Sequence, residues 1–380
     1  MTVLTQVAFA EEVARWEHQH GSLGVKWVFL DVGAISRQAK QRFGALGLYL
    51  HYMSWQRQAY LRARALCAED SFDVVHHLTM NGFRVPGHLW RLPVPFVWGP
   101  IGGFQDADRT LMAVQGLSVG TVRERVRSLL NRRSRWARLP RACASRAAVV
   151  VGANQDSMAW LRSVPVRGEV LQCLEAGIDV VNSRVRSLPA RARRILWVGS
   201  GACYKNPEFA LLAFAVVRKA AGPSWSLMMV GVSSDREREL RRWAKKRSMG
   251  LEGVEITGKV EKEALPDLYD SAHQFWFTSY RDTSGNVLLE AMACGTPCLA
   301  FDHQGASAIL ENGGGALVGV VELRTTIKRW AAEALLLIKN DEVWAAASQA
   351  ACDSIVNRQR WVHRVNRVYQ CVEAVLGRSK

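Results

Sequence analysis

A carboxylate inside an apolar stretch is the residue of this sequence with the most evident chemistry. Glu290 lies in the segment RDTSGNVLLEAMACGTP, which runs from Arg281 to Pro297. Apolar residues from Val287 to Cys294 surround it on every side of a helical wheel, so a helix here is expected to be buried all round. Because burying an unpaired carboxylate is costly or shifts its pKa, we expect Glu290 to have a polar partner.

The residues before Glu290 predict the start of a short helix with room for an anion. Ser284, Gly285 and Asn286 combine cap-forming side chains with a tight turn, and Gly295 ends the element. Free N–H groups at a helix start bind phosphate, so a phosphate near Gly285 and a hydroxyl-bearing group near Glu290 would satisfy both ends. The alternative is that Glu290 pairs with an arginine or a backbone amide and only stabilises the core.

A repeating strand and helix pattern from about Ile195 onward would position this helix. Short, nearly continuous apolar strands that alternate with helices form a parallel sheet covered on both faces, and ligands bind beyond the carboxyl ends of its strands. Gly199, Gly231, Thr278 and the Ser284 turn all fall at that edge. The predicted strands are 195–199, 226–231, 254–257, 274–278 and 297–301, and the predicted helices are 207–219, 235–247 and 262–272.

The first half shows the same alternation more loosely, with strands predicted at 3–5, 26–30, 73–77, 95–98 and 148–152. The polar stretch from Arg184 to Arg194 indicates a linker. A last helical pattern from Val362 to Leu376 is expected to pack on a domain that is already folded. We therefore expect an N-terminal domain over 1–185, a C-terminal domain over 186–355 and a closing helix over 356–380.

Composition restricts the class of protein. The 380 residues suffice for two domains by a prior of about 150 residues each. With 49% hydrophobic and 22% charged residues, the chain is an ordinary globular one. No apolar run approaches the roughly 18 residues that a membrane span needs. Eight cysteines without a C-x-x-C pair indicate a reducing cytoplasm.

The net charge of +16 is concentrated between Arg123 and Arg146. Arginines in this helix-prone segment alternate with apolar residues such as Trp136, and Glu124 is its one acid. Such a surface can lie on an anionic membrane with Trp136 at the interface, or follow a nucleic-acid backbone. A solvated face is the third reading, and nucleic acid is the less favoured partner.

Residues from about Asp73 to Tyr369 resemble the family 4 retaining glycosyltransferases (glycosyl transferases group 1). Their GT-B fold is α/β, with two Rossmann-like doubly wound domains facing a cleft and a C-terminal helix that returns to the first domain. The segment SYRDTSGNVLLEAMACGTPCLAF is similar to the family's E-x7-E motif. The resemblance implies that Glu290 binds the ribose of a nucleotide sugar and that Asp282, one carbon shorter than the usual Glu, contacts the donor sugar.

A second segment, VGSGACYKNPEFALLAFAVV, looks like the family stretch in which an Arg and a Lys hold the donor diphosphate. The resemblance implies that Lys205 is that lysine and that Gly199 belongs to the donor loop. Ser200 stands where the family has its arginine. Losing one of two cations could cost about 1.5 to 3 kcal/mol, so either another arginine compensates or donor binding is weak.

A third segment, FDVVHHLTMNGFRVPGHLWRLPVPFVWGPIGGFQ, resembles a branch of the family with HHLT and GP-x-GG loops at the cleft. The resemblance implies that His76 or His77 reaches the acceptor or the reacting sugar. It also implies that Gly99, Gly102 and Gly103 let the backbone approach the substrate closely. The alternative for His77 is a packed histidine at a strand end.

A D-x-D pattern, which binds metal in other glycosyltransferases, occurs at Asp106 and Asp108 on a loop after GPIGGFQ. We treat it as chance, and no metal or cofactor is predicted.

The opening TVLTQ looks like the family's second strand, and the first strand with its Gly-rich loop has no counterpart. That strand is central in the family's sheet, so its absence would leave two strands without a neighbour. We expect either a start upstream or a degraded copy.

The resemblance implies a glycosyltransferase that moves a sugar from a nucleotide diphosphate sugar to a hydroxyl of a glycan or lipid-linked glycan, with retention, in bacterial polysaccharide synthesis. It is expected in the cytoplasm, where it can also bind the inner membrane face. The leaving phosphate accepts the proton, and no side-chain nucleophile is implied. One alternative is a catalytically impaired glycosyltransferase-like partner or scaffold; another is a sugar epimerase or phosphorylase on the same fold.

Overall fold

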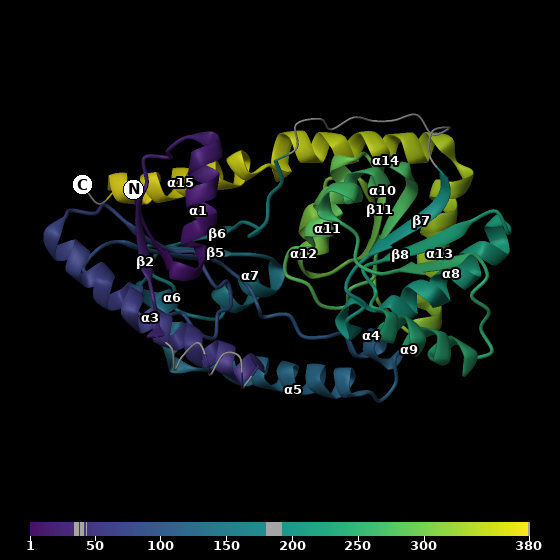
Figure 1. The fold of residues 1–380 in the computed structure, drawn as a ribbon, viewed down its shortest axis with the longest axis horizontal. Helices are drawn as coiled ribbons and strands as arrows, with labels where there is room; N and C mark the ends of the chain where they lie inside the picture. The colour runs from purple at the N-terminus through teal and green to yellow at the C-terminus, as the bar shows by residue number, and fades with distance from the viewer. Residues whose placement is uncertain (34–37, 39–41, 43, 180–191, 379–380) are drawn as a thin grey trace.

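The C-terminal half forms one six-stranded parallel sheet in the computed structural model, which describes residues 1–378 apart from 34–37, 39–41, 43 and 180–191 (Figure 1). The hydrogen-bonded order is β12-β11-β10-β7-β8-β9. The strands are β7 (Ala192–Val198), β8 (Ser226–Val230), β9 (Val254–Thr257), β10 (Ala272–Phe277), β11 (Cys298–Phe301) and β12 (Gly315–Val318). Every residue of β10 and β11 is buried, as near-continuous apolar runs predict.

Helices cover both faces of this sheet. They are α8 (Pro207–Ala221), α9 (Ser234–Lys245), α10 (Leu265–Ser271), α11 (Asn286–Ala293), α12 (Gln304–Leu310), α13 (Leu323–Lys339) and α14 (Asp341–Ser354). Trp197 and Trp276 pack into one core with α8 and α13. Leu196 and Phe275, one residue earlier on the same strands, pack into a second core with α11 and α12. Successive strand residues face opposite sides, so the sheet is doubly wound as predicted.

The N-terminal half contains two separate parallel sheets within the described residues. The strands β1 (Thr2–Gln6) and β2 (Lys26–Leu30) pair only with each other. A four-stranded sheet has the order β3-β4-β5-β6 and consists of β3 (Val75–His77), β4 (Phe96–Ile101), β5 (Val149–Gly152) and β6 (Glu169–Gln172). The strands of this half are therefore divided between two sheets, and the absence of a central first strand stays a prediction.

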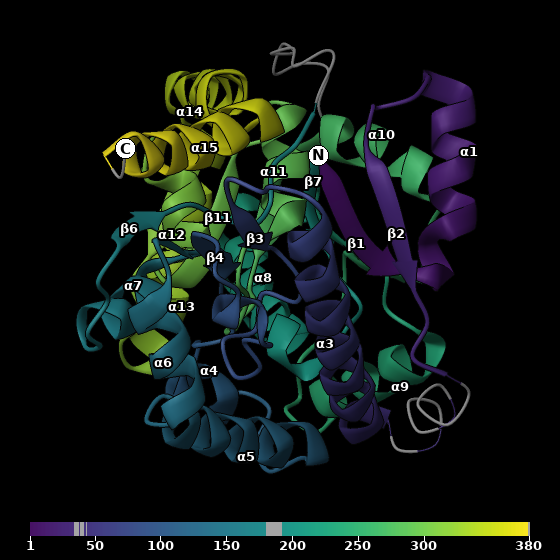
Figure 2. The same ribbon diagram turned by 90° about the vertical axis from the view of Figure 1, so that its left-hand side faces the viewer.

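A long helix packs where the two N-terminal sheets are not joined by strand pairing. The helices of this half are α1 (Ala10–His20), α3 (Gly44–Glu69), α4 (Arg109–Ala113), α5 (Val119–Ser134), α6 (Arg138–Arg146) and α7 (Gln155–Arg162). Tyr52, Trp55 and Ala59 of α3 form a small core with Leu4 and Leu30 of the first sheet, among others. Figure 2 shows α3 running past β1 and β3. The side chains of α3 therefore hold the first sheet at a place where, among the described residues, no strand hydrogen bonds join it to the second sheet.

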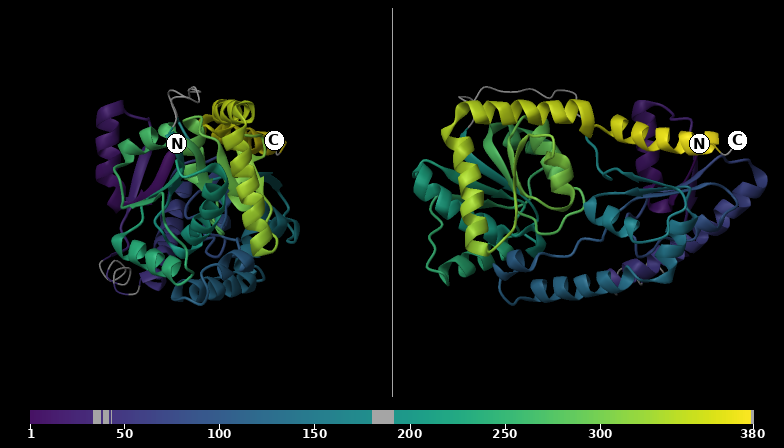
Figure 3. Two further views of the ribbon diagram at one scale, coloured as in Figure 1. Left: turned by 90° about the vertical axis from the view of Figure 1, so that its right-hand side faces the viewer. Right: turned by 180° about the vertical axis from the view of Figure 1, so that it is seen from behind.

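The C-terminal helix returns to the N-terminal half, as predicted. The helix α15 (Trp361–Arg378) follows α14 through a π-helical turn and runs along the top of the molecule (Figures 1 and 3). Val368 and Val372 are buried against Val97, Val149 and Val151 of the four-stranded sheet. The predicted linker from Arg184 to Arg194 and the predicted boundary at 185 lie largely outside the described residues.

The basic segment from Arg123 to Arg146 is not one helix. It is divided between α5, which ends at Ser134, and α6, which begins at Arg138. Ser118 caps α5 in a capping box with Thr121, two residues that the charge pattern did not single out. Across the part of the chain that the structure describes, no helix has the length and apolar character to span a bilayer.

Candidate functional site

Side chains at the carboxyl edge of the C-terminal sheet hold the loop that carries Lys205. Trp197 donates from Nε1 to Thr278 Oγ1 (2.9 Å), and this hydroxyl oxygen lies 2.9 Å from the carbonyl oxygen of Lys205 and 3.1 Å from that of Asn206. A Cβ on Gly199 would come within 2.9 Å of the Trp197 indole, so the loop passes tightly over β7. These contacts fix Lys205 at the edge where the sequence predicts a donor.

Lys205 and Asp282 form an ion pair with 2.5 Å between Nζ and Oδ2. Their side chains are 19% and 22% exposed, so both charges are partly shielded from water. The ammonium of Lys205 also lies 5.4 Å from the ring centre of Phe277 and 5.5 Å from that of Tyr204. The structure thus brings together two residues that the sequence assigned separately to the diphosphate and to the sugar.

Glu290 has the polar partner that burial demanded. Tyr269 of α10 donates its hydroxyl to Glu290 Oε2 (2.9 Å). Burial, followed by the charge of Glu290, raises the pKa of Tyr269, so the hydroxyl stays protonated. The prediction that the helix is buried all round is wrong, because Asn286 is exposed and Val287 and Glu290 are half-buried. Helix α11 is short and packs on the sheet by its other side, which leaves the carboxylate accessible at one face.

The loop before α11 is held by its own side chains and by α12. Asp282 Oδ1 accepts from the backbone N–H of Gly285 (3.3 Å), and Gln304 Oε1 accepts from the N–H of Asp282 (2.7 Å). Gly285 precedes Asn286 with a φ of 74°, a left-handed conformation that suits glycine, and no side chain caps the helix at that residue. Ser284 is buried. The prediction that Ser284 or Asn286 caps the helix is therefore wrong, because no side chain makes the capping hydrogen bond at Gly285.

An arginine from α9 lies next to the loop in which Ser200 replaces the expected cation. Ser200 itself is exposed. Arg236 donates from Nε to the carbonyl oxygen of Gly201 (2.7 Å) and pairs with Glu208 and Glu239. Arg236 is therefore one arginine that contacts this loop, although two carboxylates already share its charge.

His76, on the acceptor side, is held by hydrogen bonds on both ring nitrogens. Its Nε2 lies 2.7 Å from the carbonyl oxygen of Gly99, and its Nδ1 lies 3.1 Å from the hydroxyl of Tyr369 on α15. Because a carbonyl only accepts, Nε2 carries the proton and Nδ1 accepts from Tyr369. Burial lowers the pKa of His76, which keeps the ring neutral near pH 7.

His77 is packed inside the N-terminal half. Its Nε2 lies 2.9 Å from Gln56 Nε2 and 3.1 Å from the Tyr52 hydroxyl, and it contacts the carbonyl oxygen of Thr79. Burial lowers its pKa to about 4. This placement corresponds to the packed histidine at a strand end, and a role for either histidine toward a substrate stays a prediction.

The glycines of the GP-x-GG loop have two different surroundings. A Cβ on Gly99 would approach the carbonyl oxygen of Val151 to 2.3 Å, so this glycine serves the close pairing of β4 with β5. Gly103 has a φ of 84°, which favours glycine without any substrate. A Cβ on Gly102 would meet Thr283 of the opposite half at 2.5 Å. Of these three glycines, Gly102 is the one that lies close to the loop of Thr283.

Thr283 is the point at which the two halves touch beside the predicted donor. Asn154 Nδ2 donates to the carbonyl oxygen of Thr283 (3.2 Å). Glu175, from the loop after β6, lies close to Gly102. Burial raises the pKa of Glu175, while the neighbouring Ser284 lowers it. A carboxyl group with a raised pKa therefore lies between the acceptor-side and donor-side loops.

A second contact between the halves involves a bidentate ion pair. Arg281 donates from Nε and Nη2 to the two carboxylate oxygens of Glu124 on α5 (2.8 and 2.9 Å). Its guanidinium also lies 4.4 Å from the ring centre of Tyr204. Since Arg281 directly precedes Asp282, helix α5 of the N-terminal half positions the donor-side loop.

Sequence reasoning did not find Glu175, Arg281, Tyr269, Gln304 or Asn154. Glu175 was detectable in principle, because it lies in the loop after a strand of a parallel sheet, at the edge where ligands bind, but β6 (EVLQ) was too short and polar to be predicted. Arg281 stands inside the quoted motif, yet its partner is far away in the sequence. The other contacts are equally non-local.

The D-x-D aspartates both have partners in the fold. Asp106 pairs with Arg132 (3.1 Å) and Arg135 (3.5 Å), and Asp108 caps α4 by accepting from the N–H of Leu111 (2.9 Å). Within the described residues, no cluster of three or more His, Cys, Asp or Glu side chains is arranged to hold a metal ion.

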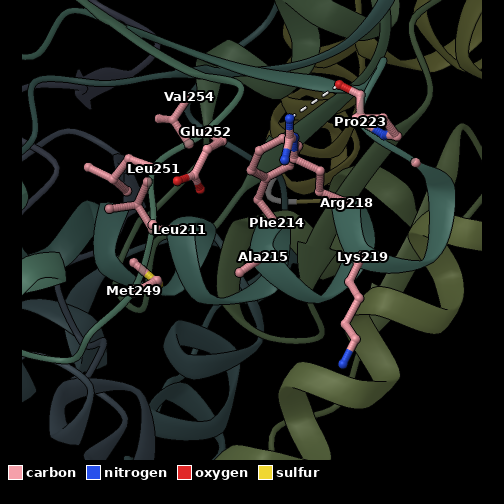
Figure 4. A pocket seen from close by; sticks show the side chains of 12 residues that line it. Leu211, Phe214, Ala215, Arg218, Lys219, Pro223, Met249, Leu251, Glu252 and Val254 are labelled. Carbon is pink, nitrogen blue, oxygen red and sulfur yellow. Dashed lines mark hydrogen bonds between the residues drawn. The ribbon is translucent and has the colours of Figure 1, made fainter.

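A hollow of about 340 Å³ on the C-terminal half lies away from this edge (Figure 4). Leu211, Phe214 and Arg218 of α8 line it together with residues 249–252, which precede β9, and with Val254 at the start of β9. Arg218 Nη2 donates to the carbonyl oxygen of Pro223, just before β8. The hollow therefore lies at the amino ends of the strands, opposite the edge where Lys205, Asp282 and Glu290 gather.

Residues 182–353 match the model of the family described as Glycosyl transferases group 1. The C-terminal half therefore carries a glycosyltransferase domain. A curated relative, the mannosylfructose-phosphate synthase of Agrobacterium fabrum, is 39% identical over 72 residues. The match covers 19% of this chain and 16% of the relative.

Solved structures resemble nearly the whole chain. A sucrose-phosphate synthase from Thermosynechococcus elongatus is 17% identical with a TM-score of 0.60 over 94% of this chain and 84% of its own. Anabaena HepE in complex with UDP-glucose is 16% identical with a TM-score of 0.59 over 98% of this chain and 91% of its own. The glycosyltransferase domain and the N-terminal half together have the GT-B fold.

Proposed function

We propose that this protein transfers a sugar from a nucleotide diphosphate sugar to a hydroxyl group of an acceptor, with retention of the anomeric configuration. The observation that carries the proposal is the ion pair of Lys205 and Asp282, with Glu290 on the helix that follows Asp282, within the segment that matches a glycosyltransferase family. The HepE structures hold UDP, UDP with glucose, or UDP-glucose, which favours a uridine diphosphate donor here as well.

In the proposed site, each side chain has a distinct task. Glu290 accepts hydrogen bonds from the ribose hydroxyls, and its bond from Tyr269 holds it in place. Lys205 and the start of α11 neutralise the diphosphate as charge develops on it. Asp282 orients the donor sugar, so its pairing with Lys205 also places the sugar next to the diphosphate.

The proposed reaction takes place on one face of the sugar. The acceptor oxygen forms a bond to the anomeric carbon while the bond from that carbon to the phosphate oxygen breaks. The leaving diphosphate takes the proton of the acceptor hydroxyl, so the step needs no side-chain nucleophile. The contacts of Asn154 and Gly102 with Thr283 support this proposal, because a loop held beside the proposed donor site would exclude water.

We propose a glycan or lipid-linked glycan as acceptor, polysaccharide synthesis in a bacterium as the context, and the cytoplasm, with access to the inner membrane face, as the location. The scattered free cysteines support a reducing compartment. The names of the two synthases indicate a sugar phosphate as an acceptor class to include in tests.

Thermal unfolding in the presence of UDP-, GDP- and ADP-sugars tests donor binding. We expect one class to raise the Tm of the wild type, and Glu290→Gln to weaken its binding about tenfold or more, since a charged hydrogen bond is lost. Glu373→Gln, an exposed acid on α15, is the matched control and should bind normally. If no nucleotide sugar raises the Tm of the wild type, the catalytically impaired partner becomes the better explanation.

Turnover separates transfer from its rivals on the same fold. Release of nucleoside diphosphate should depend on the added acceptor, and NMR of the product should show the donor's anomeric configuration. Conversion of a labelled donor to another sugar without acceptor would instead indicate an epimerase. Formation of a sugar 1-phosphate would indicate a phosphorylase.

A further inference from the structure

Helix α5 buries polar residues and exposes apolar ones. The residues that face the protein are polar, and Thr121, Glu124 and Asn131 are buried at helical spacing. The opposite side presents a run of exposed apolar residues, Val119, Val122, Val126, Leu129 and Leu130. A surface helix ordinarily buries its apolar stripe and solvates its polar one. We call the exposed residues of this stripe the outward stripe.

The inward polar contacts prevent α5 from rotating to hide the outward stripe. Arg127 Nη1 and Asn131 Nδ2 both donate to the carbonyl oxygen of Gln105 (2.8 and 3.0 Å). Glu124 makes its two bonds to Arg281. Burial lowers the pKa of Arg127 to about 10, still far above neutrality, so its charge remains. Rotation would leave these charged groups unpaired, which costs several kcal/mol for a buried ion pair.

Exposed arginines border the outward stripe, and α5 has no exposed acid that could balance their charge. Arg123, Arg125, Arg132 and Arg133 are exposed, whereas Glu124, the one acid of α5, is buried. The outward face of α5 therefore combines an apolar stripe with net positive charge. This combination is typical of helices that lie in the interfacial region of an anionic bilayer.

A pocket lies at the C-terminal end of α5, between that end and residues of α6 and α7. It measures about 410 Å³ and is lined by Arg132, Arg135 and Arg141 with Trp136, Trp160, Asp156 and Ser163 among others. Trp136 is 75% exposed, and Arg141 lies 5.8 Å from its ring centre. Burial raises the pKa of Asp156, while Arg135 lowers it. The pocket thus contains three guanidinium groups beside an exposed indole, and two of them, those of Arg132 and Arg135, also pair with Asp106.

The start of α3 adds apolar surface next to α5. Leu46, Leu50 and Met53 are exposed at a spacing of four and three residues. Arg84 donates to the Tyr49 hydroxyl (3.0 Å) and also binds Asn131 of α5, so the two helices are tied together. Figures 1 and 3 show both helices along the same lower side of the molecule.

We propose that the outward stripe of α5, with the pocket at its end, docks on a membrane that contains anionic phospholipid. Charge complementarity and the apolar stripe together favour lipid over nucleic acid, since a phosphate backbone offers no partner for Leu129 and Leu130. The lipid would supply acyl chains to the stripe and headgroup phosphates to the arginines. Because Glu124 holds Arg281, the docking helix also fixes the loop of Asp282, which links membrane contact to the proposed donor site.

Co-sedimentation of the full chain with vesicles tests the docking and needs neither donor nor acceptor. We expect binding to phosphatidylcholine vesicles that contain 30% phosphatidylglycerol, on the order of tenfold or more above pure phosphatidylcholine. The variant Leu129→Gln with Leu130→Gln should lose at least tenfold in partitioning. Arg132→Gln with Arg133→Gln should lose about 25-fold, or about fivefold for each arginine.

Two control variants match these changes elsewhere. Leu336→Gln alters an exposed leucine of α13, and Arg242→Gln with Lys246→Gln removes two exposed charges at α9; both should bind vesicles like the wild type. The α5 variants should keep the wild-type Tm and any donor-induced shift. Equal binding to neutral and anionic vesicles, or equal loss in the controls, would overturn the proposal. It would also be overturned if the α5 variants change only retention on duplex DNA or only the oligomeric state.

Discussion

The donor-side and acceptor-side halves use the same kind of parallel sheet in different ways. In the C-terminal half the sheet is continuous, both faces are covered, and the residues of the sequence motifs converge on one edge. In the N-terminal half the sheet is divided, and the motif histidines are bonded to the protein itself. The comparison teaches that the motif residues of the C-terminal half form a charged pair at a sheet edge, whereas the motif histidines of the N-terminal half make their hydrogen bonds inside the fold.

The largest expected effect is on the donor half. Lys205→Met removes the cation that is predicted to bind the diphosphate and breaks the ion pair with Asp282. We expect kcat/KM to fall 100- to 1000-fold, about 3 to 4 kcal/mol, as for the loss of one charge-stabilising group. Steady-state release of nucleoside diphosphate measures it. Lys219→Met on α8, remote from the edge, is the control, and an unchanged kcat/KM for Lys205→Met would mean that the diphosphate is held elsewhere.

The next effect concerns the contact between the halves. Glu124→Gln leaves Arg281 partly buried and without its bidentate carboxylate, so we expect the free energy of unfolding to fall by about 2 to 3 kcal/mol. Urea unfolding measures the change. Glu237→Gln breaks the surface pair with Arg241 on α9 and should cost about 0.5 kcal/mol or less. Equal losses in the two variants would show that α5 does not hold the donor-side loop.

The smallest effect concerns His77 on the acceptor side. Its folded-state pKa of about 4 lies below the unfolded value of about 6.5, so below pH 6.5 the unfolded chain binds the proton first. Stability should therefore fall as the pH drops from 6.5 toward 4. The part due to His77 should reach about 2 kcal/mol between pH 7 and 5.

Urea unfolding of the wild type and His77→Gln at pH 7, 6 and 5 isolates this part, because other groups titrate alike in both proteins. His20→Gln, an exposed histidine, should keep the wild-type slope. A His77→Gln protein that retains the slope would refute burial as the main property of His77. Loss of turnover without loss of stability would instead support the predicted substrate role.

The sequence predicted the donor half better than the acceptor half for a physical reason. Strand β9 had the predicted bounds, because its apolar run is short and clearly flanked; in the N-terminal half this held for β2, but the strand β6 was not predicted. The burial cost of a carboxylate correctly required a partner for Glu290. The identity of that partner, Tyr269, depended on how α10 packs against α11, which local pattern does not encode.

The long helix α3 shows most clearly what the hydrophobic periodicity of a sequence does not predict. Apolar and polar residues occur all around it, so its periodicity was weak and it was not predicted. The direction in which α5 faces was equally hidden, because a basic amphipathic pattern does not say which side turns inward. Tertiary contacts at Gln105 and Arg281 decide that, and they lie in other segments of the chain.

The return of α15 has a consequence for the order of folding during synthesis. Val97, Val149 and Val151 belong to the four-stranded sheet, yet they are covered by Val368 and Val372, which the ribosome adds only after the entire glycosyltransferase domain. One face of the first sheet therefore stays uncovered while the second domain is made. The nascent N-terminal half should bind chaperones until α15 emerges, and the first domain to begin would be the last to finish.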